Sequence, residues 1–410
     1  MALGEVLLQV FIIFVAAKIA GEVCLRLAVP SVVGELLAGV VLGPHALGLI
    51  GLPGPAMIAA LGDYHLAEET LGGALEILAE IGVIVLLFTV GLETRLSDIL
   101  QVGKRASLVA LGGVVLPLGA GYLFGTALGE PLPAALFLGA ALVATSVGIT
   151  ARVLGDLGQL TTDAARIILG AAVVDDILGL LVLAMVSGLA TGGLSPVSVV
   201  VLAVEAFGFT ALVVLVGRRA LIRFDDHLDD LRLPNSRFAV ALAVCLGLAV
   251  AAGYLGLAAI VGAFLAGMVF AEARDREELE RQAGTLYDVL VPFFFVVSGT
   301  QVDPALFLDP TRLAFAAGLT LLAIITKMLG AAAGGAGLKR KELAVVAVGM
   351  VPRGEVGLVV AGIGRATGAL TDELFSDVVM MSLVTALIVP PVLQAILRRP
   401  ERSEPREEVE

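Results

Sequence analysis

Long apolar segments separated by short polar ones fill almost the whole chain, and this alternation restricts it to a membrane fold. About 20 apolar residues at ~1.5 Å each span the ~30 Å hydrocarbon core of a bilayer. Thirteen segments come close to or exceed that length in a chain of 410 residues that is 59% hydrophobic and 16% charged. Their approximate bounds are 4–27, 31–47, 74–92, 105–128, 133–153, 165–190, 196–217, 236–253, 256–272, 285–300, 313–333, 342–365 and 374–397. The sequence therefore predicts an all-α polytopic protein with one membrane domain over residues 1–398, and a loop or re-entrant piece at 51–62.

Lysine and arginine gather in the connections that follow every odd-numbered segment. On the opposite side only Arg312 and Arg365 lie in connections. Because basic residues accumulate in cytoplasmic loops, this pattern places the N-terminus outside and the C-terminus in the cytoplasm. The tail at 399–410 is polar and is predicted to be disordered.

Two adjacent carboxylates stand near the middle of one apolar segment. Asp175 and Asp176 are the only charged residues between Ile167 and Met185. A charged side chain at the bilayer centre costs ~2.5–3.5 kcal/mol on insertion scales, so such residues are functional candidates. The pattern predicts an ion or proton site within the membrane. The alternative is a pair neutralised by a structural cation or by hydrogen-bonded protons.

A third charge, Lys327, lies deep in the segment 313–333. A buried ammonium group needs a partner, and Asp175 or Asp176 is the natural one. Gly330 and Gly334 form a GxxxG pattern that allows close helix approach and could bring Lys327 to the aspartates. A static neutral pair without a role in transport is the alternative.

The chain contains an internal similarity. Residues 33–41 and 261–269 share the pattern VGxxLAGxV, and 88–91 resembles 296–299 in the following segments. The matching segments are seven apart, an odd number, so the two copies have opposite orientations. Segments 1–6 and 8–13 are therefore predicted to be inverted-topology repeats, joined by the segment 196–217.

Two corresponding segments carry residues that break helices. ATSVGIT at 144–150 contains Thr145, Ser146 and Gly148, and MVPRGEVGL at 350–358 contains Pro352 and Gly354. Such residues interrupt the helical hydrogen bonds, and the freed carbonyls and half-helix ends can hold a cation. The alternative is ordinary kinks in packed helices.

Arg353 and Glu355 lie within the second of these breaks. Opposite charges are costly to leave unpaired in a membrane, so we expect them to compensate each other structurally, and a place on the ion path is the alternative. The sequence shows no P-loop and no GxGxxG, and its three histidines lack ligand spacing. It predicts no enzyme, no cofactor, no transition metal and no nucleic-acid partner.

Five stretches carry a family resemblance: LLFTVGLETRLSDIL, LVATSVGITARVL, RIILGAAVVDDILGL, IVGAFLAGM and GMVPRGEVGL, which begin at residues 86, 142, 166, 260 and 349. Together they resemble the bacterial NapA-type sodium/proton antiporters of the monovalent cation:proton antiporter-2 family, over nearly the whole chain. The resemblance implies thirteen transmembrane helices, two broken helices that cross, a homodimer and a location in the bacterial inner membrane.

The resemblance also implies that two parts of the chain have different roles. A dimerisation part at about 4–92 and 236–300 would be joined by the linker 196–217 to a mobile core at about 105–190 and 313–397. Asp175 and Asp176 would bind Na⁺ or protons, Lys327 would bridge to Asp175, and the exchange would be electrogenic. Li⁺ or K⁺ could replace Na⁺. A potassium/proton antiporter and a passive cation channel are the alternatives.

Overall fold

The computed structural model of the chain describes residues 2–94, 96–191, 196–217, 219, 223, 235–305, 310–353 and 355–398. The predicted tail 399–410 lies outside this part. The described residues form helices and contain no strand. The first half holds α1 (Ala2–Arg26), α2 (Ser31–Leu42), α3 (Pro55–Leu61), α4 (Tyr64–Leu92), α5 (Leu96–Ala127), α6 (Leu132–Val143), α7 (Val147–Asp156), α8 (Asp163–Thr191) and α9 (Pro196–Leu212), which ends in the π-helical turn Val213–Gly217. The second half holds α11 (Ser236–Tyr254), α12 (Ala259–Phe270), α13 (Arg276–Thr300), α14 (Pro310–Gly334), α15 (Arg340–Gly349), α16 (Glu355–Ala366) and α17 (Asp372–Arg398).

Every predicted apolar segment coincides with a helix or with a pair of half-helices. Within the described part of the chain, ten helical spans are long and apolar enough to cross a bilayer, and α2 and α12 are shorter apolar helices. The prediction of an all-helical multi-pass membrane protein is therefore confirmed.

Helix ends differ from the predictions where polar residues extend or stop a helix. α4 begins at Tyr64 rather than near 74, because the Asp63 carboxylate accepts a hydrogen bond from the amide of Leu66 at 2.9 Å and caps the helix. α13 begins at Arg276 rather than near 285. The stretch 51–62 contains the short helix α3. Local capping sets the beginning of α4, and hydropathy does not detect it.

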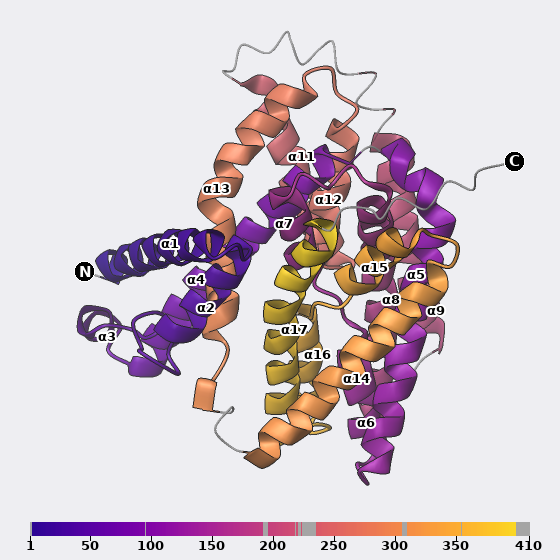
Figure 1. Ribbon diagram of the computed structural model, residues 1–410. Coiled ribbons are helices and arrows are strands. Elements are labelled where there is room, and N and C mark those ends of the chain that lie inside the picture. Colours follow the sequence, from indigo (N-terminus) through magenta and orange to yellow (C-terminus); the bar gives the residue numbers. More distant parts are fainter. Residues whose placement is uncertain are drawn as a thin grey trace, which may run out of the picture.

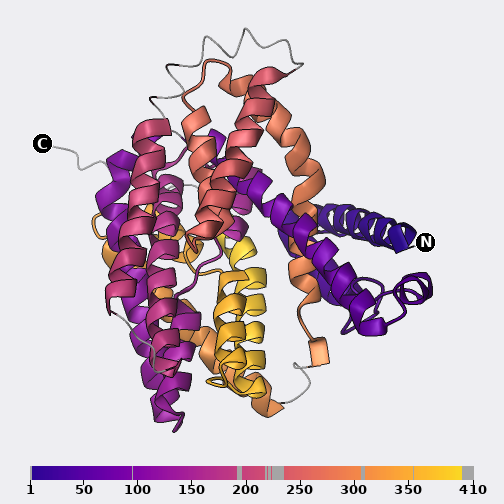
Figure 2. The same cartoon turned by 180° about the vertical axis from the view of Figure 1, so that it is seen from behind.

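The helices lie in two groups. α1 to α4 and α13 lie on one side of the molecule, and α5, α6, α8 and α14 to α17 lie on the other (Figure 1). The view from behind shows the same separation (Figure 2). α11 and α12 pack on each other and on α4, with the first group. α7 follows α6 in the chain and packs on α8 and α17, so we count it with the second group, although it also touches α4 and α2 of the first. We call these the scaffold group and the core group.

Glycines bring backbones into direct contact within each group. A Cβ added at Gly39 of α2 would lie 2.8 Å from Cα of Gly299 in α13. One added at Gly91 of α4 would lie 2.9 Å from Cα of Gly267 in α12. In the predicted repeat Gly39 corresponds to Gly267 and Gly91 to Gly299, so the two contacts join equivalent positions. They support the repeat, which stays a prediction.

The core group also contains close backbone contacts at glycines. A Cβ at Gly330 of α14 would lie 2.2 Å from the carbonyl oxygen of Gly112 in α5, and one at Gly334 would meet the backbone of Leu108. The GxxxG pattern of α14 therefore faces α5, and only glycine fits at this crossing.

Candidate functional site

Two membrane spans are broken in the middle of the core group, and the breaks touch. α6 ends at Val143 and α7 begins at Val147, while α15 ends at Gly349 and α16 begins at Glu355. The amide of Ser146 in the first break donates to the carbonyl of Pro352 in the second at 2.8 Å. The structure thus brings together the two segments that the sequence predicted to be broken.

Buried hydroxyl groups stabilise the two breaks. Thr150 Oγ1 donates to the carbonyl of Gly349 at 2.6 Å, and Thr145 Oγ1 donates to that of Met350 at 3.5 Å. These carbonyls end α15 and lack helical partners, so side-chain donors replace the missing bonds. Gly148 lies in the first turn of α7 rather than in the break itself. Gly354 and the side chain of Glu355 lie outside the described residues.

Lys327 lies fully buried between four helices. Its Nζ donates to Asp175 Oδ1 and to the carbonyls of Gly113 and Val143, each at 2.8 Å. These three bonds satisfy all three donors of the ammonium group. The residue pattern alone left the partner open between the two aspartates and the family resemblance implied Asp175; the structure pairs Lys327 with Asp175. Because Val143 ends α6, Lys327 also places a positive charge at the C-terminus of a half-helix, where it is stabilised by the helix dipole.

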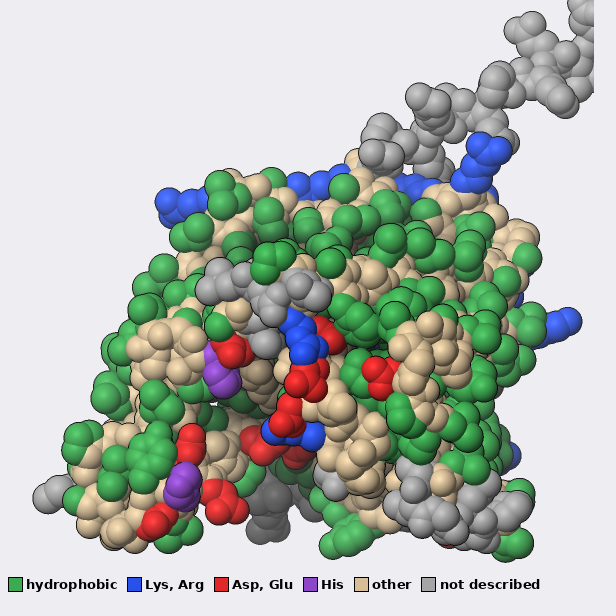
Figure 3. Space-filling view, turned by 90° about the horizontal axis from the view of Figure 1, so that it is seen from below, with side chains coloured by type: hydrophobic (Ala, Val, Ile, Leu, Met, Phe, Trp, Pro, Cys, Tyr) green, Lys and Arg blue, Asp and Glu red, His purple; other side chains and the backbone are tan. Residues whose placement is uncertain are grey.

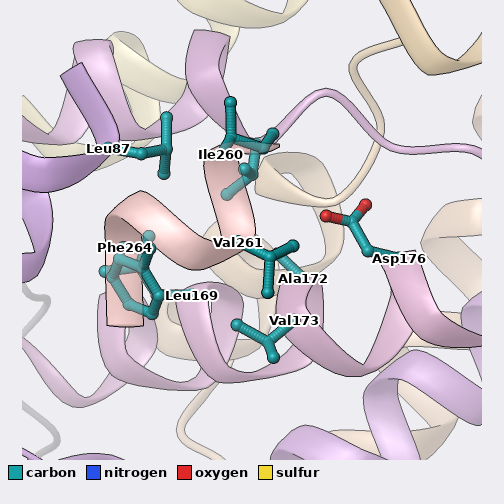
Figure 4. A pocket seen from close by; sticks show the side chains of 9 residues that line it. Leu87, Leu169, Ala172, Val173, Asp176, Ile260, Val261 and Phe264 are labelled. Atoms are coloured by element: carbon teal, nitrogen blue, oxygen red, sulfur yellow. The ribbon is translucent and has the colours of Figure 1, made fainter. Parts of the chain in front are cut away.

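Asp176, the next residue on α8, lines a cavity beside this pair. Its side chain is half-buried and reaches a small cavity bounded by α8 and α7 of the core group and by α4 and α12 of the scaffold group (Figure 4). The other lining residues are apolar: Leu87, Val147, Leu169, Ala172, Val173, Ile260, Val261 and Phe264. Adjacent residues on a helix point about 100° apart, so one aspartate can bind Lys327 while the other faces the cavity.

Arg353 is completely buried at the second break. Its guanidinium group donates to the carbonyls of Leu142, Val351 and Met350, which end α6 and α15. Its amide donates to Thr385 Oγ1 at 3.1 Å. Arg353 therefore stabilises the C-termini of both half-helices through their carbonyls. These bonds fit the expected structural role, but that role, the alternative place on the ion path and the pairing with Glu355 all stay predictions.

A second polar cluster lies elsewhere and was missed from the sequence. Glu35 of α2 and Arg152 of α7 are both buried and lie 3.5 Å apart. Neither residue is among the site residues predicted from the sequence. The carboxylate of Glu35 inside the apolar segment 31–47 was the feature of the sequence that could have indicated this cluster. Among the described residues, no three or more His, Cys, Asp and Glu side chains come close enough to hold a metal ion.

Comparison with known proteins gives a consistent result. The family model described as "Sodium/hydrogen exchanger, transmembrane" matches residues 10–399. The chain is 38% identical to the high-affinity Na⁺/H⁺ antiporter NhaS3 of Synechocystis sp., over 98% of this chain and 92% of that protein. It is 34% identical to the Na⁺/H⁺-K⁺ antiporter GerN of Bacillus cereus, over 95% and 96%. Its fold is similar to that of the sodium proton antiporter MjNhaP1 of Methanocaldococcus jannaschii, with a TM-score of 0.66 at 17% identity over 96% and 97% of the two chains.

Proposed function

The chain belongs to the transmembrane sodium/hydrogen exchanger family, and from this premise we propose that it exchanges Na⁺ for H⁺ at Asp175 and Asp176. One observation carries the proposal. The Asp176 carboxylate reaches a cavity beside the buried Asp175–Lys327 pair, next to the contact between two broken helices. Buried charges that could be replaced by apolar groups are costly, so their presence favours a working site.

The carboxylates can exchange the two ions because Na⁺ and H⁺ compete for the same oxygens. Na⁺ is a hard cation that prefers carboxylate and carbonyl oxygens. When Na⁺ arrives at Asp176 and draws Asp175 away from Lys327, the ammonium group loses its counter-ion and releases a proton. A second proton comes from Asp176. Two protons for one Na⁺ make the cycle electrogenic, with ~2.3 kcal/mol per charge for every ~100 mV of membrane potential.

Transport across the membrane requires the site to face each side in turn. We propose that the core group (about 105–190 and 313–397) moves like an elevator against the scaffold group (about 4–92 and 236–300), with 196–217 as the linker. The cavity at Asp176 supports this division, because helices of both groups line it. We also propose that the scaffold group forms a homodimer.

We propose the bacterial inner membrane as the location, with the N-terminus outside and the C-terminus in the cytoplasm. The end of the molecule seen in Figure 3 carries Asp, Glu and His side chains, with some Lys and Arg, among hydrophobic ones.

Proteoliposomes containing the purified protein provide the test. An imposed Na⁺ gradient is expected to drive opposite proton flux, and Asp176→Asn is expected to abolish that flux because the amide cannot carry a charge. Glu22→Gln is the matched control, since Glu22 is an exposed carboxylate on α1 paired with Arg26 at 2.8 Å. Unchanged flux in the Asp176→Asn variant would refute the assignment.

A second candidate is potassium/proton exchange, which similarity to GerN, a Na⁺/H⁺-K⁺ antiporter, favours. Competition between Na⁺, Li⁺ and K⁺ in the same vesicles separates the two. A passive cation channel would instead show cation flux without coupled proton movement.

A further inference from the structure

A buried polar cluster joins the scaffold group to the core group at a distance from the aspartate pair. The scaffold supplies Ser31 and Glu35 from α2 and Tyr287 from α13, and the core supplies Arg152 and Asp156 from α7. Glu35 is only 3% exposed and Arg152 only 8%. We call these five residues the α2–α7 cluster.

Arg152 is the centre of this cluster. Its Nη2 lies 3.5 Å from Glu35 Oε1 and 3.3 Å from Ser31 Oγ, and its Nε lies 3.2 Å from the Asp156 carboxylate. Ser31 Oγ donates to Asp156 Oδ2 at 3.2 Å. The guanidinium carbon lies 4.7 Å from the centroid of the Tyr287 ring, which is within the range of a cation–π contact. Each contact except that between Arg152 and Asp156 crosses from one group to the other.

The pair at the centre of the cluster is incompletely bonded. Glu35 Oε2 and Arg152 Nη1 are buried and have no hydrogen-bond partner among the described residues. A bidentate arginine–carboxylate pair would use both groups at about 2.8 Å. A buried ion pair with unsatisfied polar atoms adds little to the stability of one fixed conformation. Such a pair is better suited to a contact that forms and breaks.

The cluster also breaks the symmetry of the predicted repeat. In the alignment of 33–41 with 261–269, Glu35 corresponds to Ala263, and Ser31 corresponds to Ala259. Extending the match of 88–91 with 296–299 makes Ala79 the counterpart of Tyr287. The scaffold therefore offers polar partners to the core on one side of the membrane and alanines at the equivalent places on the other. Without this difference, the two inverted repeats of the scaffold would make similar contacts with the core in the two transport states.

We propose that the α2–α7 cluster is a latch between the scaffold and the core. Glu35 and Arg152 are positioning residues that hold α7 against α2 in the conformation described here and separate in each transport cycle. The latch favours one of the two states, and its strength sets their relative population. The inference rests on the proposed function, because a latch needs two parts that move.

Cross-linking tests whether the contact must open. The variant Ser31→Cys/Asp156→Cys, made with Cys24→Ser and Cys245→Ser, places two thiols where the structure has a 3.2 Å hydrogen bond. Oxidation is expected to lower Na⁺/H⁺ exchange about tenfold or more, and a reductant is expected to restore it. Full transport by protein that is cross-linked on a gel would overturn the proposal. Failure of two reactive thiols to cross-link would also overturn it, because the contact would then be absent in the membrane.

A second variant tests the effect on the two states. Glu35→Gln keeps the shape of the side chain and removes its charge, so we expect the apparent KM for Na⁺ to change about tenfold. Glu22→Gln on the exposed surface of α1 is the control and should retain the parental KM. A parental KM in Glu35→Gln would contradict the latch. If the unmodified protein itself shows no exchange, the proposed function fails; if it exchanges ions and the cross-linked variant does so equally, only the latch fails.

Discussion

Removing the ammonium group of Lys327 should destabilise the protein strongly. Lys327→Gln leaves the buried carboxylate of Asp175 and the carbonyls of Gly113 and Val143 without the charged donor that now contacts each at 2.8 Å. Removing one partner of a buried ion pair costs ~3–5 kcal/mol, chiefly because the other charge stays behind. With roughly 2 °C per kcal/mol for a large chain, the melting temperature should fall by about 6–10 °C.

Unfolding of the detergent-solubilised protein, followed by circular dichroism on heating, measures this change. Lys327→Gln/Asp175→Asn removes both charges and should recover at least half of the loss, because no charge is then left unpaired. Lys18→Gln is the control: Lys18 is exposed on α1 and donates to the carbonyl of Asp288 at 2.7 Å, so its loss should cost less than about 1 kcal/mol. A melting temperature within about 1 °C of the parent for Lys327→Gln, or a double variant less stable than the single one, would refute the reasoning.

Two further predictions concern packing and pH. Gly330→Ala, whose Cβ would lie 2.2 Å from the carbonyl oxygen of Gly112, should lower stability by ~1–3 kcal/mol in a thermal melt, while Gly318→Ala, which has no neighbour within 4 Å, should not lower it. Burial, and then the nearby charge of Glu280, raise the pKa of Glu93 at the end of α4. Because the folded pKa exceeds the unfolded one, Glu93 contributes stability below its unfolded pKa that is lost as the pH rises through the folded pKa. Melting curves from about pH 4 to pH 8 should therefore show a smaller fall in stability with rising pH for Glu93→Gln than for the parent, and identical slopes would contradict this prediction.

The sequence predicted the membrane spans and the two breaks because hydropathy and helix-breaking residues are local properties. The residue pattern alone could not choose between Asp175 and Asp176 as the partner of Lys327, although the family resemblance implied Asp175. That choice depends on the rotation of α8 about its axis, which tertiary packing decides.

The partners of Lys327 and Arg353 show a second limit of prediction from the sequence. Most of them are backbone carbonyls, of Gly113, Val143 and Leu142 among others. Every residue carries such a group, so no side-chain pattern marks the ones that a buried cation will contact. The pairing of Glu35 with Arg152 was missed for a related reason, since the two residues are far apart in the chain and only the fold brings them together.

The glycine contacts have a mechanical consequence. Gly39 with Gly299 and Gly91 with Gly267 interlock scaffold backbones, and Gly112 with Gly330 interlocks core backbones. Between the two groups, the described glycine Gly148 meets only side-chain atoms of Leu86, Val83 and Phe294, at 3.5 Å or more. Backbones are thus interlocked within each group, whereas at Gly148 the two groups meet through side chains. The proposed movement of the core against the scaffold would therefore be a shear along this boundary rather than a bending of either group.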